Sequence, residues 1–133
     1  MQYWKTVPAA FLSRPNRFIA KVEIGGREET VHVKNTGRCR ELLSPGAVVY
    51  VQDWGEAHPG RKTRYDLVTV EKGVLTINMD AQAPNPLFRE WAEAGHFVPG
   101  LTLLRPETTH GDSRFDFYWE AGQRRGFVEV KGV

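Results

Sequence analysis

Phe18-Ile19-Ala20-Lys21-Val22-Glu23-Ile24-Gly25-Gly26 is the stretch that decides how the first part of the chain folds. Its apolar side chains at positions 18, 20, 22 and 24 would share one face of an extended strand, because successive side chains of a strand point to opposite faces. The two glycines then supply the positive φ angles of a tight hairpin turn. We therefore expect a β-hairpin whose return strand covers residues 29–33.

The same strand-and-turn pattern continues through the first 80 residues. Further strands are expected at 48–52, 65–70 and 74–78, separated by a loop at 35–38, one helical turn at 40–43 and a polar loop at 54–62. Five short strands in this length predict a small antiparallel barrel of the OB type rather than a parallel sheet. Such barrels often carry single-stranded nucleic acids or oligosaccharides, but the fold is commoner than that function.

A different pattern begins at Ala81. Asn85 followed by Pro86 predicts a helix over residues 86–94, with Asn85 as its N-cap and Gly95 as its C-terminal stop. The elements expected after it are an apolar stretch at 101–104, a polar loop, and strands at 114–120 and 126–133. The sequence therefore predicts two domains, residues 1–80 and residues 81–133.

The composition is that of a soluble globular protein, with 133 residues of which 41% are hydrophobic and 26% charged. No apolar run approaches the roughly 20 residues needed to cross a bilayer, and the first residues lack the features of a secretory signal. We therefore expect a cytoplasmic protein with no membrane partner. Cys39 is the one cysteine, so neither an internal disulfide nor a zinc site built from thiolates is expected.

Basic residues gather in three short clusters in the first part of the chain, although the formal net charge is only +2. The clusters are Arg14-Pro15-Asn16-Arg17, Arg38-Cys39-Arg40 and Arg61-Lys62-Thr63-Arg64. Folding that brings them together would create a phosphate-binding face, whereas separate clusters would be ordinary solvated loops.

Six side chains in or beside these clusters are candidate nucleic-acid ligands. Guanidinium groups bind phosphate through two parallel hydrogen bonds, and side-chain amides can add neutral ones. The candidates are Arg14, Asn16, Arg17, Asn35, Arg38 and Arg64. Stabilising a turn is the alternative role for the two asparagines.

The last two expected strands place two acids opposite one another. Ala121-Gly122-Gln123-Arg124 has glycine at the first central position of a two-residue loop, which is the preference of a type II′ turn. That turn pairs residues whose numbers sum to 245, so Asp116 falls opposite Glu129 with both side chains on one face. Lys131 shares that face, because side chains two apart in a strand point the same way.

Asp116, Glu129 and Lys131 form a pattern that suits metal-assisted hydrolysis. Two neighbouring carboxylates repel unless one is protonated or a cation lies between them, and Mg²⁺ suits such a pair. Lys131 could orient or deprotonate a metal-bound water for attack on a phosphodiester. The alternative is a hairpin with a solvated polar face, on which the three side chains form exposed ion pairs.

Ordered motifs along nearly the whole chain resemble the sugar fermentation stimulation protein A family. The motifs are Arg14-Pro15-Asn16-Arg17-Phe18, Asn35-Thr36-Gly37-Arg38, Glu41-Leu42-Leu43, Pro45-Gly46, Arg64-Tyr65-Asp66-Leu67, Asn78, Asn85, Ser113-Arg114-Phe115-Asp116-Phe117 and Glu129-Val130-Lys131. The resemblance implies a DNA-binding protein of mixed fold. An OB-like antiparallel β-barrel would be followed by the start of a restriction-endonuclease-like α/β domain of the PD-(D/E)xK type.

The resemblance also implies roles for four residues near the end of the chain. Asp116 and Glu129 would be the metal-binding acids, with Mg²⁺ as the cofactor, and Lys131 would be the catalytic lysine. Glu107 would be a fourth catalytic member, and a carboxylate at the end of a loop is the alternative for it.

Two functions follow from these residues and the resemblance. The first is a Mg²⁺-dependent nuclease that acts on DNA, with RNA as the alternative substrate. The second is a non-catalytic DNA-binding regulator of sugar (maltose) metabolism, and a purely structural hairpin domain is a third alternative. Family members continue beyond the end of this sequence, so we expect an N-terminal fragment whose nuclease-like domain is incomplete and which is inactive by itself.

Overall fold

The computed structural model describes residues 1–56 and 60–132. The chain forms two compact units, Gln2–Ala81 and Gln82–Val133, with Met1 grouped with the second. Among the described residues, no helix is long and apolar enough to cross a membrane.

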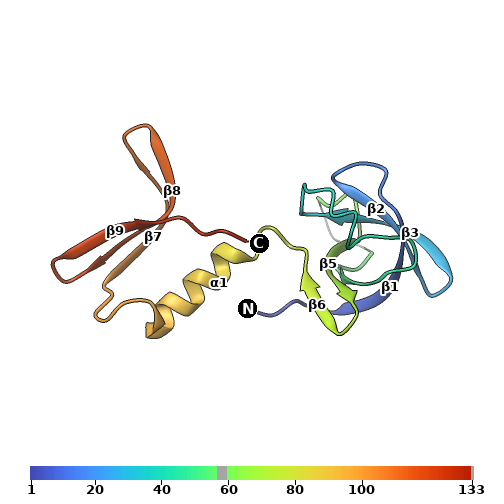
Figure 1. The fold of residues 1–133 in the computed structure, drawn as a ribbon, viewed down its shortest axis with the longest axis horizontal. Helices are drawn as coiled ribbons and strands as arrows, with labels where there is room; N and C mark the ends of the chain where they lie inside the picture. The colour runs from blue at the N-terminus through green and yellow to red at the C-terminus, as the bar shows by residue number, and fades with distance from the viewer. Residues whose placement is uncertain (57–59, 133) are drawn as a thin grey trace. The chain divides into compact units, whose positions relative to one another are not determined.

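The first unit is a closed five-stranded barrel with one further strand attached (Figure 1). Its strands are β1 (Thr6–Ser13), β2 (Ile19–Ile24), β3 (Arg27–Val33), β4 (Val48–Asp53), β5 (Tyr65–Lys72) and β6 (Leu75–Asn78). Antiparallel pairing follows the order β3-β2-β1-β4-β5-β6, and a parallel pairing of β3 with β5 closes the barrel. The predicted OB-like barrel is therefore confirmed.

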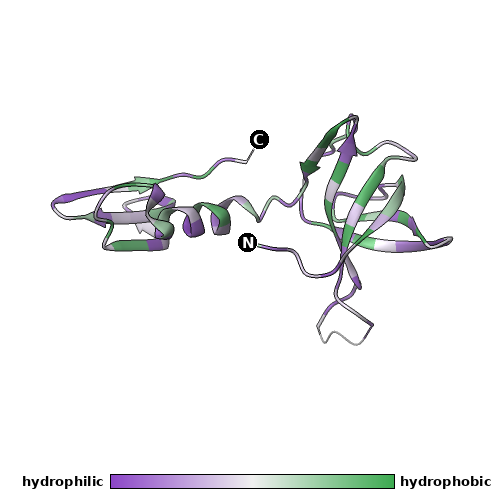
Figure 2. Cartoon of the chain, turned by 90° about the horizontal axis from the view of Figure 1, so that it is seen from below, coloured by the Kyte–Doolittle hydropathy of each residue, from purple (hydrophilic) through white to green (hydrophobic). Residues whose placement is uncertain are grey.

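The hairpin predicted around Gly25 and Gly26 forms between β2 and β3. Ile24 pairs with Arg27, and Gly25 and Gly26 have φ angles of 56° and 82°, the signature of a type I′ turn. Ala20, Val22 and other inward-facing residues of the barrel strands are fully buried. Figure 2 shows the resulting alternation of hydrophobic and hydrophilic residues along the strands.

Membership of the barrel differs from the prediction in one strand. β1 was not predicted, because Pro8 and a run of small residues obscure its alternation. Residues 6–9 of β1 pair only with β4, and the pairing with β2 begins at Ala10, so Pro8 lies where one side of the strand has no ladder to interrupt. The predicted strand at 74–78 exists as β6, but it pairs with β5 alone and lies outside the closed barrel.

The second unit contains one short helix and a three-stranded antiparallel sheet. Its elements are α1 (Pro84–Trp91), a single wider helical turn η1 (Ala92–His96), β7 (Leu103–His110), β8 (Ser113–Ala121) and β9 (Arg124–Val128). The sheet order is β7-β8-β9. The aromatic ring of Phe88 on the helix lies 5.1 Å from that of Phe117 on β8, measured between ring centroids, so the helix packs on the sheet.

The helix begins two residues before the start, and ends three residues before the end, of the predicted range 86–94. The helix begins at Pro84 with Ala83 as N-cap, and Asn85 lies inside the first turn, where its side chain is free to reach the sheet. Two prolines within the first three positions suit this start, since neither has an N–H that the first turn requires. Gly95 ends the regular helical backbone with a φ of 94°.

The strand β7 replaces most of the polar loop expected before Ser113. His110 pairs with Ser113 around a two-residue turn at Gly111-Asp112. Pro106 fits this strand because β7 pairs only with β8, and an edge strand tolerates a residue without an N–H. The β8–β9 register is as predicted, with Phe117 opposite Val128 and Ala121 opposite Arg124, but β9 ends at Val128 rather than at residue 133.

Candidate nucleic-acid interface

An open groove of about 790 Å³ lies on the barrel beside the loop between β1 and β2. It is lined by residues 11–18, by Thr36, Arg38 and Arg40 from the loop after β3, and by Leu43 and Pro45. Four of these residues are arginines, Arg14, Arg17, Arg38 and Arg40, and the described lining contains no carboxylate. Folding thus brings two of the three basic clusters together on one concave surface.

Arg14 organises this groove from within. One guanidinium nitrogen donates to the carbonyl oxygens of Gly37 and Arg38, the latter at 3.0 Å. The other donates to the carbonyl oxygens of Arg17, at 2.8 Å, and Asn35. The side chain therefore ties the loop after β1 to the loop after β3 through its two terminal nitrogens, while its buried Nε has no hydrogen-bond partner among the described residues.

Asn16 and Asn35 shape the two loops by local hydrogen bonds. The Asn16 Oδ1 atom accepts from the backbone N–H groups of Phe18 at 2.8 Å and Ile19 at 3.1 Å. The Asn35 Oδ1 atom accepts from the backbone N–H of Gly37 at 2.9 Å. These are Asx-type turns, so the structure favours the turn-stabilising role for both asparagines.

Arg17, Arg38 and Arg40 are exposed, and their charges are not matched by acids. Among the ion pairs that the structure gives for residues 1–56 and 60–132, none involves these three guanidinium groups. The Arg17 guanidinium lies 5.5 Å from the centroid of the Phe18 ring. A surface with three unneutralised guanidinium groups attracts anions.

The third basic cluster lies outside the groove, and both of its arginines are paired with acids. Arg64 donates from Nε and from a terminal nitrogen to the two carboxylate oxygens of Asp53, at 2.7 and 2.9 Å. Mainly through these hydrogen bonds, the pKa of Asp53 falls from 3.8 to about 2, although burial opposes the shift. Arg61 is hydrogen-bonded to the buried carboxylate of Asp66.

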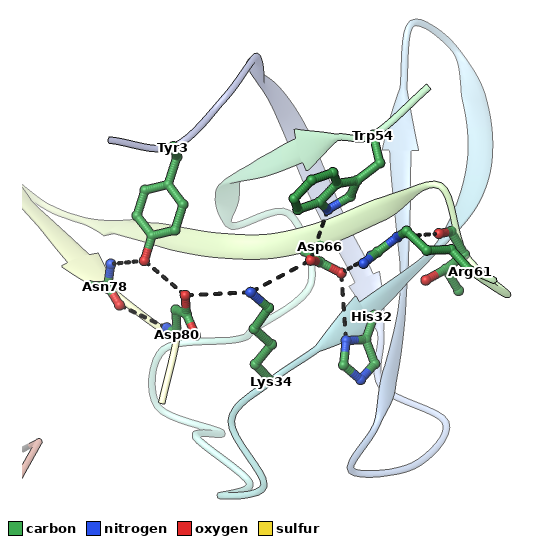
Figure 3. Close-up of polar contacts among 9 residues, drawn as sticks. Tyr3, His32, Lys34, Trp54, Arg61, Asp66, Asn78 and Asp80 are labelled. Carbon is green, nitrogen blue, oxygen red and sulfur yellow. Dashed lines mark hydrogen bonds and ion pairs between the residues drawn. The ribbon is translucent and has the colours of Figure 1, made fainter. Parts of the chain in front are cut away.

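Asp66 belongs to a polar network that crosses the barrel wall (Figure 3). Its carboxylate accepts from the indole N–H of Trp54 at 2.9 Å and lies 3.7 Å from the Lys34 ammonium group. Lys34 also lies 3.6 Å from Asp80, whose carboxylate accepts from the hydroxyl of Tyr3 at 2.9 Å. His32 of β3 stands opposite Asp66 of β5, so the network spans the parallel pairing that closes the barrel.

A row of acids crosses the sheet of the second unit. Residues paired between β7 and β8 have numbers that sum to 223, which places Glu107 opposite Asp116. The printed β8–β9 pairs sum to 245 and end with Phe117 opposite Val128, so Glu129 follows the end of β9, and its predicted position opposite Asp116 lies beyond the paired residues. Glu107 also has a φ of 51°, a left-handed conformation that is uncommon for a residue with a side chain. The acid row therefore consists of Glu107 on β7, Asp116 on β8 and Glu129, the residue that follows β9.

The carboxylates of this row hold local partners. Asp116 accepts from the backbone N–H of Val130 at 2.7 Å and from the side-chain amide of Asn85 at 3.1 Å. The Lys131 ammonium lies 3.6 Å from the Glu129 carboxylate, and Arg114 lies 3.1 Å from that of Glu107. Within the described part of the chain, no group of three or more acid, histidine or cysteine side chains is gathered closely enough to hold a metal ion.

Family models account for both units. Residues 12–79 match the model described as the SfsA N-terminal OB domain, and residues 82–133 match the one described as the sugar fermentation stimulation protein RE domain. The chain belongs to the sugar fermentation stimulation protein family. The family named in the sequence analysis is therefore confirmed.

Relatives of this family member share its whole length. A sugar fermentation stimulation protein homolog of Desulfitobacterium hafniense (strain DSM 10664 / DCB-2) is 60% identical over 133 residues, which are 100% of this chain and 57% of the relative. A homolog of Ruminiclostridium cellulolyticum is 53% identical over 100% of this chain and 58% of its own length. The chain therefore spans a little more than half the length of these relatives.

A solved structure of the family has the same fold. The structure of Pyrococcus furiosus SfsA in complex with Ca²⁺ is 30% identical in sequence, with a TM-score of 0.81. The likeness covers 97% of this chain and 55% of the Pyrococcus chain.

Two groove residues of this SfsA family member were not among the predicted ligands. Arg40 lies two residues after Arg38 in the same basic cluster. Its membership of that cluster is the sequence feature that could have identified it as a ligand. Phe18 was expected on the buried face of a strand, whereas the structure leaves 53% of it exposed at the groove. Its position immediately before β2, rather than inside it, explains the difference.

Proposed function

We propose that the barrel of this family member binds nucleic acid through the arginine groove. The observation that carries the proposal is the convergence of Arg17, Arg38 and Arg40 on a concave surface whose described lining has no acid. Guanidinium groups bind phosphate oxygens in a bidentate manner, and their unneutralised charge supplies most of the affinity for a nucleic acid. The OB domain match supports the same function.

The contacts divide the predicted ligands into two groups. Arg17 and Arg38, together with Arg40, would contact phosphates. Arg14, Asn16 and Asn35 would position the loops that carry these side chains, as their hydrogen bonds to backbone groups indicate. Arg64 would reach a phosphate only by breaking its hydrogen bonds to Asp53, so it is not among the proposed phosphate ligands.

Fluorescence anisotropy with labelled oligonucleotides at several salt concentrations tests this proposal. The variant with Arg17→Gln, Arg38→Gln and Arg40→Gln should bind more weakly and should depend less on salt. The slope of log affinity against log salt should fall by about 2 for a single strand, because each lost phosphate contact changes it by about 0.7. Arg27→Gln, an exposed arginine at the β2–β3 turn, is the matched control and should leave the slope unchanged. An unchanged slope in the triple variant would exclude the groove as the binding site.

A second function, Mg²⁺-dependent phosphodiester hydrolysis, is favoured by the acid row. Glu107 lies on β7, Asp116 lies on β8 and Glu129 follows β9, and the Pyrococcus relative was solved with Ca²⁺. The donors fit a hard cation, since carboxylate oxygens are its preferred ligands and, among the described residues, each Asp116 oxygen accepts one hydrogen bond, which leaves a lone pair.

In this second proposal each residue has a stated role. Asp116 and Glu129 would hold the cation, which when bound would supply positive charge to a phosphodiester. Lys131 would hold a proton beside the Glu129 carboxylate and would stabilise negative charge on a phosphate oxygen. Asn85 and the N–H of Val130 would orient Asp116.

Nicking of a supercoiled plasmid, with MgCl₂ or with EDTA, distinguishes this nuclease from a non-catalytic DNA-binding regulator. Nicking that requires Mg²⁺ and is lost in Asp116→Asn and Lys131→Met would support the nuclease. Asp112→Asn, which changes an exposed acid in the β7–β8 turn, is the control and should nick normally. Plasmid binding without nicking, measured with an unsubstituted protein that extends over the full length of the relatives, would support the regulator instead.

A further inference from the structure

We infer that the arginine groove takes single-stranded nucleic acid and that the ring of Phe18 is the platform on which an unpaired base stacks. The inference rests on the proposed nucleic-acid binding by the barrel. It deepens that proposal by naming the form of nucleic acid and a specificity-determining residue.

The exposure of Phe18 has no explanation in the barrel core. Ala20 and Val22, which follow it at strand spacing, are fully buried, whereas 53% of Phe18 remains exposed. Exposed phenyl surface that faces a groove is available to a ligand, and base stacking on an aromatic ring is sequence-tolerant because every base has a π-face.

The backbone holds Phe18 in place from both sides. Its N–H donates to the Asn16 Oδ1 atom at 2.8 Å, and its carbonyl oxygen accepts from the N–H of Val33 at 2.7 Å. Arg14 fixes the same loop through the carbonyl oxygen of Arg17. The ring is therefore presented by an ordered loop, which lowers the entropy lost when a base stacks on it.

The charges around the ring match a nucleotide that presents base and phosphate together. The Arg17 guanidinium lies 5.5 Å from the ring centroid, and Arg38 and Arg40 line the same groove. Phosphates on either side of a stacked base could then meet guanidinium groups while the base covers the phenyl ring.

A duplex does not satisfy this arrangement. Its bases are stacked on one another and present only their edges in the grooves, where a protein reads them with a protruding helix or β-ribbon. The feature here is concave and is lined mainly by loop residues at 14–18 and 36–45. A flexible strand with splayed bases can follow such a groove, so the geometry favours the single strand.

Anisotropy titrations with one labelled oligonucleotide in three forms test the inference. The forms are the single strand, its duplex, and a single strand of the same length with abasic sites. The single strand should bind at least about tenfold more tightly than the duplex. Phe18→Ala should weaken single-strand binding by about tenfold and leave the salt slope unchanged, because no phosphate contact is lost.

The abasic strand isolates stacking from charge, since it keeps the phosphates and lacks the bases. The unsubstituted protein and Phe18→Ala should bind it equally, and Phe18→Trp should restore tight binding of the normal strand. Trp4→Ala is the matched control, because Trp4 is 72% exposed and is not among the groove residues. Circular dichroism checks that each variant is folded.

The outcomes separate this inference from the proposal beneath it. Equal binding of duplex and single strand, with no effect of Phe18→Ala, would overturn the stacking role even while the arginine substitutions still weakened binding. If neither form bound at all, the proposed nucleic-acid binding would fail and the inference with it.

Discussion

Two clusters of the barrel have the same spacing of arginines and different environments. Arg14 and Arg17 stand three apart at the groove, and Arg61 and Arg64 stand three apart in the loop before β5. The first pair meets carbonyl oxygens and a phenyl ring, whereas the second pair meets the carboxylates of Asp66 and Asp53. The comparison shows that an arginine is available to bind a phosphate only where it does not already form an ion pair with a carboxylate of the same chain.

The difference arises from the strands beneath each cluster. Asp53 ends β4 and Asp66 lies in β5, and each is at least 95% buried. A buried carboxylate requires hydrogen bonds and a counter-charge, because removing it from water is unfavourable. Arg61 and Arg64 meet that requirement, while the groove loops offer Arg14 only neutral carbonyl groups and leave Arg17 unmatched.

The largest change in the free energy of unfolding is expected for Asp66→Ala, which removes the acid that Arg61 contacts. The change leaves the charges of Lys34 and Arg61 and the indole N–H of Trp54 without their shared acceptor. Removing one partner of a buried ion pair lowers stability by about 3 kcal/mol or more, so the free energy of unfolding should fall by that amount in urea titrations. Glu56→Ala, an exposed acid near Arg64, should change it by less than about 0.5 kcal/mol. A small effect of Asp66→Ala would mean that the network does not stabilise the barrel.

Arg14→Ala tests the internal role assigned to an arginine of the groove. Loss of its hydrogen bonds to four carbonyl oxygens should lower the free energy of unfolding by about 2 kcal/mol. Amide hydrogen exchange should rise in residues 35–40, which Arg14 ties to the loop after β1. Arg17→Ala is the matched control and should leave both measurements nearly unchanged, since the Arg17 guanidinium forms no hydrogen bond with the other described residues. Equal effects of the two changes would break the distinction between them.

A smaller effect is expected when single arginines of the two clusters are removed and oligonucleotide affinity is measured. Arg38→Ala should weaken binding several-fold and lower the salt slope by about 0.7 for a single strand. Arg64→Ala should change affinity by less than about twofold, because Asp53 already neutralises Arg64. If Arg64→Ala weakened binding as much as Arg38→Ala, Arg64 would be a phosphate ligand after all.

The smallest effect concerns the acid dependence of stability. Arg64 lowers the pKa of Asp53 from 3.8 to about 2 in the folded chain. Because the folded pKa lies below the unfolded one, this stabilisation is present above pH 3.8 and is lost as the pH falls through about 2. Urea titrations at several pH values should show a flatter profile for Asp53→Asn in that window, and Asp112→Asn should keep the original profile. Identical profiles for Asp53→Asn and the unsubstituted chain would contradict the shift.

Features that depend on neighbouring residues were predicted from the sequence. The β2–β3 hairpin follows from alternation and two glycines, and the β8–β9 register follows from Gly122. β1 and β7 were not predicted. Each contains a proline, Pro8 or Pro106, at a position where the strand pairs on one side only, and strand pairing cannot be read from neighbouring residues. The position of Glu107 opposite Asp116 depends on β7 and was therefore beyond the sequence argument.

The sequence by itself determined that this is a barrel followed by a second unit with a hairpin, that its arginines cluster, and that Ala121 pairs with Arg124 at the β8–β9 turn. These properties arise from side-chain period and turn chemistry, which act over a few residues. Only the tertiary structure decided which arginines face solvent, which hold backbone carbonyls, and which neutralise buried acids. That choice depends on Asp53 and Asp66, which the barrel buries beside Arg64 and Arg61, and on loops that meet across more than 20 residues of sequence.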